Sequence, residues 1–232
     1  MQSLNVGDIH LVGVGAGGTA KLRDLIRSFR VNPNKITLWD KDIFEPKNLD
    51  NQVFDEKYLG VNKAEALAEM YGCKARPEYF HQDSCKFNPD DLMMCGVDNH
   101  AGRLSCIRAA DQNDCQVIIS ANSDDCAEAY IYYSEWKDTP CDPRVFYPEL
   151  LTDKTNDPLG PPGCVEMIAS GNTQSAMANM MGVTMAMFLF DFHTKTRVWA
   201  GRDQMASWPV HLKANKWGPV TLTCGQKMGG DR

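Results

Sequence analysis

The 232-residue sequence has no excess of positive charge: 24 Lys and Arg residues stand against 30 Asp and Glu residues, a net charge of −6. Binding to a nucleic-acid backbone requires clustered basic side chains, so this balance argues against a nucleic-acid partner. The sequence also lacks an apolar run of about 18 residues and a basic-then-apolar N-terminal signal. We therefore expect no membrane association and a cytoplasmic location.

Closely paired cysteines are absent as well. The nine cysteines include no two separated by only two residues, so a four-cysteine zinc site has no support. Their odd number and wide scatter are atypical of a secreted disulfide framework. Hydrophobic residues make up 43% and charged residues 23% of the chain, as in ordinary folded domains.

The first half of the chain has the pattern of an α/β fold. An apolar run from residue 9 ends in glycines, a helical pattern covers 19–30, and a second strand is expected at 35–40, which together form a βαβ unit. Further strands are expected at 76–81, 91–97 and 116–121, with helices at 63–71 and 101–112. We predict a Rossmann-like, mainly parallel sheet flanked by helices, with the nucleotide-binding core at 9–121 of a single domain, 1–232.

The second half adds other elements. Residues 130–136 are expected to extend the sheet antiparallel, because they follow the preceding strand too closely for a helical crossover. Region 138–171 is predicted to be a proline-rich loop insertion, 172–193 a long helix, and 198–232 a β-rich tail with short strands around its tryptophans (Trp199, Trp208 and Trp217). The methionines of the long helix favour core packing over a ligand role.

A glycine pattern suggests a nucleotide site. Gly13, Gly15 and Gly18 form GxGxxG, with Gly17 as an additional glycine, between a predicted strand and a helix, where backbone N–H groups can approach phosphate. Asp40 lies 22 residues after Gly18, where an acidic side chain can bind a ribose. A nicotinamide-dependent oxidoreductase would share these features, and a turn packed for structural reasons alone is the alternative.

The next motifs narrow the choice. The segment DKDIFEPKNLDNQ at 40–52 resembles the Asp-x-Asp-x-x-Glu and Asn-Leu-x-Arg-Gln signature of the ThiF/MoeB/ubiquitin-activating family. GVNKA at 60–64 resembles that family's Gly-x-x-Lys-Ala helix start, and VDN at 97–99 with Arg103 resembles its Asp-Asn-x-x-x-Arg stretch. A looser similarity, from Cys164 to the helix start at 171–175, is to short ThiF-like proteins of plasmid and phage ubiquitin-like gene clusters.

The resemblance implies an ATP-dependent adenylyltransferase acting on the C-terminal carboxylate of a ubiquitin-like or sulfur-carrier protein that ends in glycine. It also implies a homodimer. The residues it assigns to ATP are the four glycines, Asp40 (ribose) with Asp42 beside it, Asn48 and Gln52 (phosphates), Lys63 (phosphate charge), and Asp98 (Mg²⁺) with Asn99. Lys63 and Asp98 are the residues expected to support catalysis. As alternatives, Lys63 is a solvated helix lysine and Asp98 a helix cap.

The chain departs from the family at Asn51, where the signature has an arginine. A bidentate, charge-assisted phosphate contact is therefore missing, although Lys47 or an arginine from a second protomer could compensate. Asn51 keeps open a non-enzymatic alternative, a scaffold that binds nucleotide or partner without turnover.

Relatives in this family often carry a cysteine that accepts the activated acyl group as a thioester. Cys164, in the loop region shortly before the long helix, is the first candidate, because a thiol near a helix N-terminus is more easily ionised. Cys141 is the second candidate. Core positions are expected for four others (Cys73, Cys95, Cys106 and Cys115).

Overall fold

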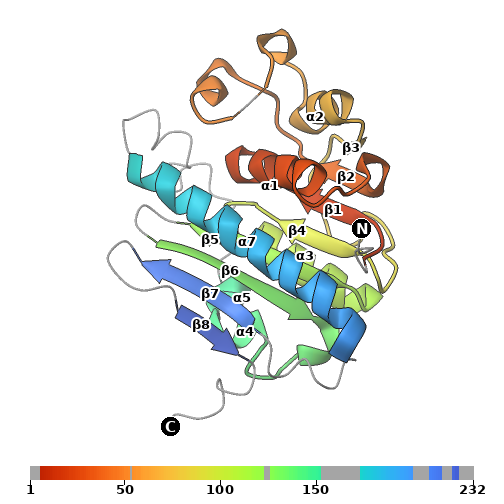
Figure 1. Ribbon diagram of the computed structural model, residues 1–232, viewed down its shortest axis with the longest axis vertical. Coiled ribbons are helices and arrows are strands. Elements are labelled where there is room, and N and C mark those ends of the chain that lie inside the picture. Colours follow the sequence, from red (N-terminus) through yellow and green to blue (C-terminus); the bar gives the residue numbers. More distant parts are fainter. Residues whose placement is uncertain are drawn as a thin grey trace.

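The computed structural model describes residues 6–52, 54–122, 126–152, 173–200, 209–215 and 221–224 (Figure 1). These residues form an eight-stranded sheet of order β3-β2-β1-β4-β5-β6-β7-β8. The strands are β1 Ile9–Val12, β2 Ile36–Trp39, β3 Lys74–Arg76, β4 Leu92–Cys95, β5 Gln116–Asn122, β6 Cys126–Tyr133, β7 Pro209–Asn215 and β8 Thr221–Cys224. The first five strands in this order, β3-β2-β1-β4-β5, pair parallel with their neighbours. Strands β6, β7 and β8 extend the sheet antiparallel. The predicted fold class is confirmed.

Helices cover both faces of this sheet. They are α1 Ala16–Arg27, α2 Lys63–Tyr71, α3 His100–Asn113, α4 Pro143–Phe146, α5 Glu149–Thr152 and α7 Thr173–Ala200, with short 3-10 helices η1 Pro33–Lys35, η2 Pro46–Asp50, η3 Glu56–Tyr58 and η4 Ser134–Trp136. Figure 1 shows α1 and α7 in front of the sheet and α3 behind it. Because both faces are covered, every residue of β1, β2 and β4 is buried, which explains their continuous apolar runs.

Three expectations about the strands were wrong. The antiparallel strand expected at 130–136 lies at Cys126–Tyr133, and Ser134–Trp136 form η4 instead. The third strand lies at Lys74–Arg76 rather than at 76–81, because Pro77 has no N–H to donate to the neighbouring strand. Trp199 belongs to α7, not to a strand of the tail. The tail is nevertheless β-rich, since β7 and β8 extend the sheet.

Helix boundaries also differ from the expectation. The helix expected at 19–30 runs from Ala16 to Arg27, so two glycines of the motif lie inside its first turn. It ends before Arg30, whose φ of +58° is incompatible with a helix. The loop expected from residue 138 contains α4 and α5, and 153–171 lie outside the described residues.

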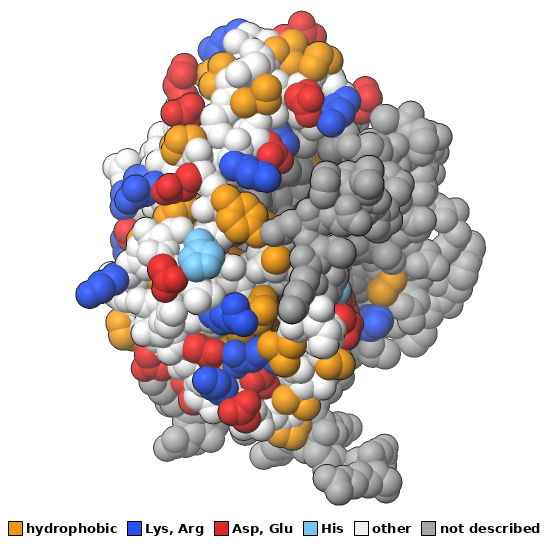
Figure 2. Space-filling model, turned by 180° about the vertical axis from the view of Figure 1, so that it is seen from behind, with side chains coloured by type: hydrophobic (Ala, Val, Ile, Leu, Met, Phe, Trp, Pro, Cys, Tyr) orange, Lys and Arg blue, Asp and Glu red, His pale blue; other side chains and the backbone are white. Residues whose placement is uncertain are grey.

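The methionines of α7 divide between core and surface. Met185 and Met187 are buried, as expected, but Met177 and Met180 are 64% and 70% exposed, and Phe188 is 48% exposed. None of the described helices is both long and apolar enough to cross a bilayer. The face opposite to the view of Figure 1 carries acidic and basic side chains intermixed (Figure 2), without the single-sign field of a nucleic-acid surface.

Candidate nucleotide site at the carboxyl edge of the sheet

Three neighbouring parallel strands end together at one edge of the sheet. Val12 of β1 is in register with Trp39 of β2 on one side and with Cys95 of β4 on the other. The loops that follow these strands, with the glycine motif, Asp40 and Asp98, therefore begin at the same edge. This is where ligands bind in open α/β sheets.

The glycine turn after β1 has the shape its sequence predicts. Gly13 has φ +81°, and its N–H donates to the Trp39 carbonyl at 2.9 Å. A Cβ on Gly18 would lie 2.1 Å from the Gly13 carbonyl oxygen, whereas a Cβ on Gly15 would meet nothing within 4 Å. Gly13 and Gly18 thus shape the turn, and Gly15, the N-cap of α1, leaves open space at the helix N-terminus, where anions bind favourably.

Gly17 has a different role from its neighbours. A Cβ at this position would lie 2.9 Å from Asn179 Oδ1 of α7. Gly17 therefore permits α1 and α7 to pack closely. Its role is in helix packing rather than in leaving space for a ligand at the turn.

Asp40 follows β2 and holds the glycine turn. Its Oδ2 accepts a hydrogen bond from Val14 N at 2.8 Å, and its Oδ1 accepts one from Asp42 N at 2.9 Å. Burial raises the pKa of Asp40, and these two hydrogen bonds oppose the increase. Each carboxylate oxygen retains a lone pair, so this geometry still leaves acceptor capacity for a ribose hydroxyl.

Lys63 is the first residue of α2. Its side chain is 9% exposed, and its Nζ lies 3.7 Å from Asp42 Oδ2, which belongs to a side chain that is 57% exposed. Lys63 is thus largely buried rather than a solvated helix lysine. The sequence reasoning missed Asn62, which caps α2 through Glu65 N and donates from Nδ2 to the carbonyls of Asp40 and Asp42; its position before a helical run was the available signal.

The segment around η2 contains buried amide side chains. Asn48 is 1% exposed, and its Oδ1 accepts from Glu45 N at 2.9 Å, so this side chain closes the η2 turn. The amide groups of Asn51 and Gln52 are buried and have no hydrogen-bond partner among the described residues. Buried amides without partners are unfavourable, and a polar ligand would supply the missing bonds. These two residues therefore fit a polyphosphate or nucleotide ligand.

Asp98 and Asn99 follow β4, and only one of them caps the next helix. Asn99 caps α3, with its Oδ1 accepting from Gly102 N at 2.8 Å, and its Nδ2 donates to Asp98 Oδ1 at 3.3 Å. Asp98 is exposed and does not cap the helix. Within the described residues no three His, Cys, Asp or Glu side chains form a metal-binding group. Mg²⁺ held by Asp98 would need phosphate oxygens and water as its other ligands, as is common for this ion.

The cysteines differ in how deeply they are buried. Cys95, Cys106 and Cys115 are buried core residues, as expected, and Cys73 is only partly buried. Cys141 is 7% exposed, and burial raises the pKa of its thiol, which argues against it as an acyl acceptor. Cys164 lies outside the described residues.

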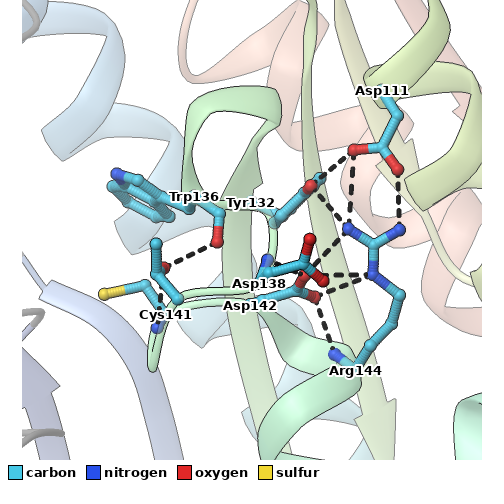
Figure 3. Close-up of polar contacts among 8 residues, drawn as sticks. Asp111, Tyr132, Trp136, Asp138, Cys141, Asp142 and Arg144 are labelled. Carbon is cyan, nitrogen blue, oxygen red and sulfur yellow. Dashed lines mark hydrogen bonds and ion pairs between the residues drawn. The ribbon is translucent and has the colours of Figure 1, made fainter.

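The segment that carries Cys141 is fixed by an arginine (Figure 3). Arg144 of α4 contacts Asp111 of α3 at 2.6 Å, Asp142 at 2.9 Å and the Tyr132 hydroxyl of β6 at 2.7 Å. Two carboxylates thus surround the guanidinium of Arg144, whose side chain is 12% exposed. This cluster joins α3, β6 and α4 on the rear face of the sheet.

A buried lysine near the glycine turn was also missed. Lys21 of α1 is 1% exposed, and its Nζ donates to the Cys95 carbonyl at 3.4 Å. Helical periodicity places Lys21 beside Leu22 and Leu25, on the face that packs against the sheet. A charged residue adjacent to an apolar stripe is usually solvated, so the sequence alone did not single it out.

A glycine turn between β1 and α1, with acidic residues after β2 and β4, defines a Rossmann-like nucleotide-binding fold. The ThiF family model matches residues 1–208, and the chain belongs to the ThiF family. Sequence comparison with curated proteins gave no match.

Solved structures with this fold include two proteins. The crystal structure of E. coli MccB has a TM-score of 0.61 and 16% identity, covering 95% of this chain and 63% of MccB. PaaA has a TM-score of 0.60 and 16% identity, covering 96% of this chain and 74% of PaaA. The structure of E. coli MccB with ATP has a TM-score of 0.55, also at 16% identity. This chain thus spans less than two thirds of the length of MccB.

Proposed function

We propose that this protein is an ATP-dependent adenylyltransferase that activates the C-terminal carboxylate of a ubiquitin-like or sulfur-carrier protein ending in glycine. The observation that carries the proposal is the meeting of the glycine turn, Asp40 and Asp98 at one sheet edge in a ThiF-family chain. The MccB structures with ATP and with MccA offer a parallel, since they contain a nucleotide and a second molecule on the same fold.

In the proposed reaction a carboxylate oxygen of the partner attacks the α-phosphorus of ATP. A new phosphorus–oxygen bond forms, the bond to the β-phosphate oxygen breaks, and pyrophosphate leaves. Such a displacement depends on alignment and charge neutralisation more than on acid–base groups. Mg²⁺ would neutralise phosphate charge when bound by Asp98.

The described residues offer groups that can bind the phosphates and the ribose of ATP. A Cβ on Gly15, the N-cap of α1, would meet nothing within 4 Å, and the backbone N–H groups at a helix N-terminus can bind phosphate oxygens. Lys63 adds a buried positive charge, and the amides of Asn51 and Gln52 offer donors that lack partners within the described part of the chain. Asp40 would accept from the ribose.

ATP–pyrophosphate exchange with a ubiquitin-like or sulfur-carrier protein that ends in glycine tests the proposal. We expect exchange that depends on the partner and is lost in Asp98→Ala and Lys63→Ala. Lys57→Ala is the matched control, because Lys57 is exposed on η3 and belongs to none of the site motifs. Nucleotide binding without exchange would instead favour the scaffold alternative, for which the missing guanidinium at Asn51 is the specific observation.

Thioester formation on Cys164 is a further part of the proposal. The structure removes support from Cys141, its competitor, because that thiol is buried. We expect a partner adduct that is sensitive to thiol reagents, is lost in Cys164→Ser and persists in Cys141→Ser. Loss of the adduct in Cys141→Ser alone would reverse the assignment.

We also propose a homodimer. Met177, Met180 and Phe188 are exposed on one side of α7, at helical spacings that align them, and exposed apolar stripes of this kind often mark interfaces. Light scattering should give twice the chain mass, and Met180→Lys with Phe188→Lys should reduce it. A strict monomer for the wild type would contradict the proposal.

A further inference from the structure

Lys21 is a buried cation without a carboxylate partner among the described residues. It lies in α1, is 1% exposed, and no ion pair joins it to a carboxylate within the described residues. Within the described part of the chain, its Nζ donates to the Cys95 carbonyl at 3.4 Å. An unpaired buried charge normally destabilises a fold, so its presence calls for a compensating function.

The position of the ammonium group is unusual. A Cβ on Gly96 would lie 2.8 Å from Lys21 Nζ, 3.4 Å from the Gly13 carbonyl oxygen and 3.9 Å from Gly18 N. Residue 96 thus lies close to both the Lys21 ammonium group and the glycine turn, and its lack of a side chain leaves room for Lys21 Nζ beside the turn.

The charge is present under ordinary conditions. Burial is the main cause that lowers the pKa of Lys21 to about 8; the neighbouring Cys95 opposes this decrease and Arg103 contributes to it. A pKa near this value still leaves most of the amine protonated at pH 7. A positive charge is thus held in a region of low dielectric, where its field extends farther than in water.

We propose that Lys21 is a positioning residue that stabilises the nucleotide phosphates through the glycine turn, in place of the positive charge that Asn51 does not supply. This inference rests on the proposed ATP site. Lys21 would not touch the phosphates, since the backbone at Gly13–Gly18 lies between them. Its ammonium group would instead strengthen the positive potential at the N-terminus of α1, where the phosphates would bind.

Calorimetric titration of Lys21→Met with Mg·ATP, and NMR titration with adenosine, test the inference. We expect Mg·ATP affinity to fall on the order of tenfold, with adenosine affinity unchanged because adenosine has no phosphate charge. Thermal unfolding should show a variant at least as stable as the wild type, since an unpaired buried charge is removed. Lys74→Met, at the opposite end of the sheet and paired with Asp8, should retain wild-type affinity for both ligands.

A second variant tests the link to Asn51. Adding Asn51→Arg to Lys21→Met should restore much of the lost Mg·ATP affinity. Equal losses for Mg·ATP and adenosine would show a purely structural role, and an unchanged Mg·ATP affinity in Lys21→Met would exclude the electrostatic one. If the wild type binds no nucleotide, the proposed function itself fails. If the wild type binds Mg·ATP and Lys21→Met binds it equally well, only the inference about Lys21 fails.

Discussion

Asp40 Oδ2 accepts a hydrogen bond of 2.8 Å from Val14 N, which joins the end of β2 to the glycine turn after β1. The same carboxylate accepts from Asp42 N through Oδ1. An acidic residue that the sequence assigns to a ribose is therefore also the group that holds the turn beneath the proposed phosphates. Fold and ligand binding are coupled at this residue.

Asp40→Asn should weaken both properties. An asparagine side chain has one acceptor oxygen, so one of the two backbone N–H groups would face an NH₂ group and lose its partner. We expect a loss of about 1–3 kcal/mol in the free energy of unfolding, with weaker Mg·ATP binding. Urea denaturation and calorimetry measure the two effects. Asp24→Asn, at a surface pair with Arg23, should change stability by less than about 0.5 kcal/mol; a similar loss there would contradict the specific role of Asp40.

Replacement by alanine should have different effects on stability at two glycines of the motif. In Gly18→Ala the new Cβ would meet the Gly13 carbonyl oxygen at 2.1 Å, so the turn must shift, and we expect a loss of about 1–3 kcal/mol in stability. Gly15→Ala places its Cβ in open space and should leave the melting temperature nearly unchanged. Because that space is the proposed phosphate position, Gly15→Ala should still weaken Mg·ATP binding. Full nucleotide affinity in Gly15→Ala would place the phosphates elsewhere.

The glycine turn and the strand ends agree with the sequence prediction because their signals are local. A glycine turn requires positive φ and close backbone approach, and Gly13 and Gly18 show both. Strand ends in a parallel sheet meet at one edge, so Asp40 and Asp98 could be placed without coordinates. The predicted bounds of the helix at 63–71 also agree with α2.

Other features depend on distant packing and could not be predicted. Nothing local distinguishes Lys21 from a solvated helix lysine; its ammonium group lies beside Gly96, which is 75 positions away in the chain. Likewise, Cys141 is buried in a segment that the contact of Arg144 with Asp111 joins to another helix, which the local sequence does not indicate. The exposure of Met177 depends on how α7 lies across the sheet, which helical periodicity alone did not determine.

His10 should make stability depend on pH. Its side chain is 9% exposed, its Nδ1 accepts from Trp39 Nε1 at 3.2 Å, and burial lowers its pKa. The unfolded chain therefore binds a proton more readily than the folded protein once the pH falls below about 6.5. The contribution of neutral His10 to stability is complete above that pH and declines as the pH falls toward the lowered value in the folded state.

Urea unfolding at pH 7.5 and pH 5.5 measures this effect. We expect His10→Gln, whose amide oxygen can still accept from Trp39, to lose less stability between the two pH values than the wild type. His81→Gln, which removes an exposed histidine, should behave as the wild type does. Equal losses in all three proteins would assign the pH dependence to other groups.

Arg144 should be among the most sensitive positions on the rear face. Its side chain is 12% exposed, and its guanidinium lies between the carboxylates of Asp111 and Asp142, so Arg144→Met leaves two negative charges close together without compensation. We expect a loss of about 3–5 kcal/mol in the free energy of unfolding, measured by urea denaturation. Arg23→Met, at an exposed pair, should cost less than about 1 kcal/mol.

A double mutant distinguishes lost charge balance from lost packing. If repulsion between the two carboxylates dominates, Asp111→Asn should recover part of the stability lost in Arg144→Met, because it removes one of the unpaired charges. The coupling energy between these two residues should then be well above the few tenths of a kcal/mol expected for independent sites. Additive losses would instead mean that Arg144 acts chiefly through the packing of its side chain over the Tyr132 ring, 5.2 Å from the guanidinium carbon.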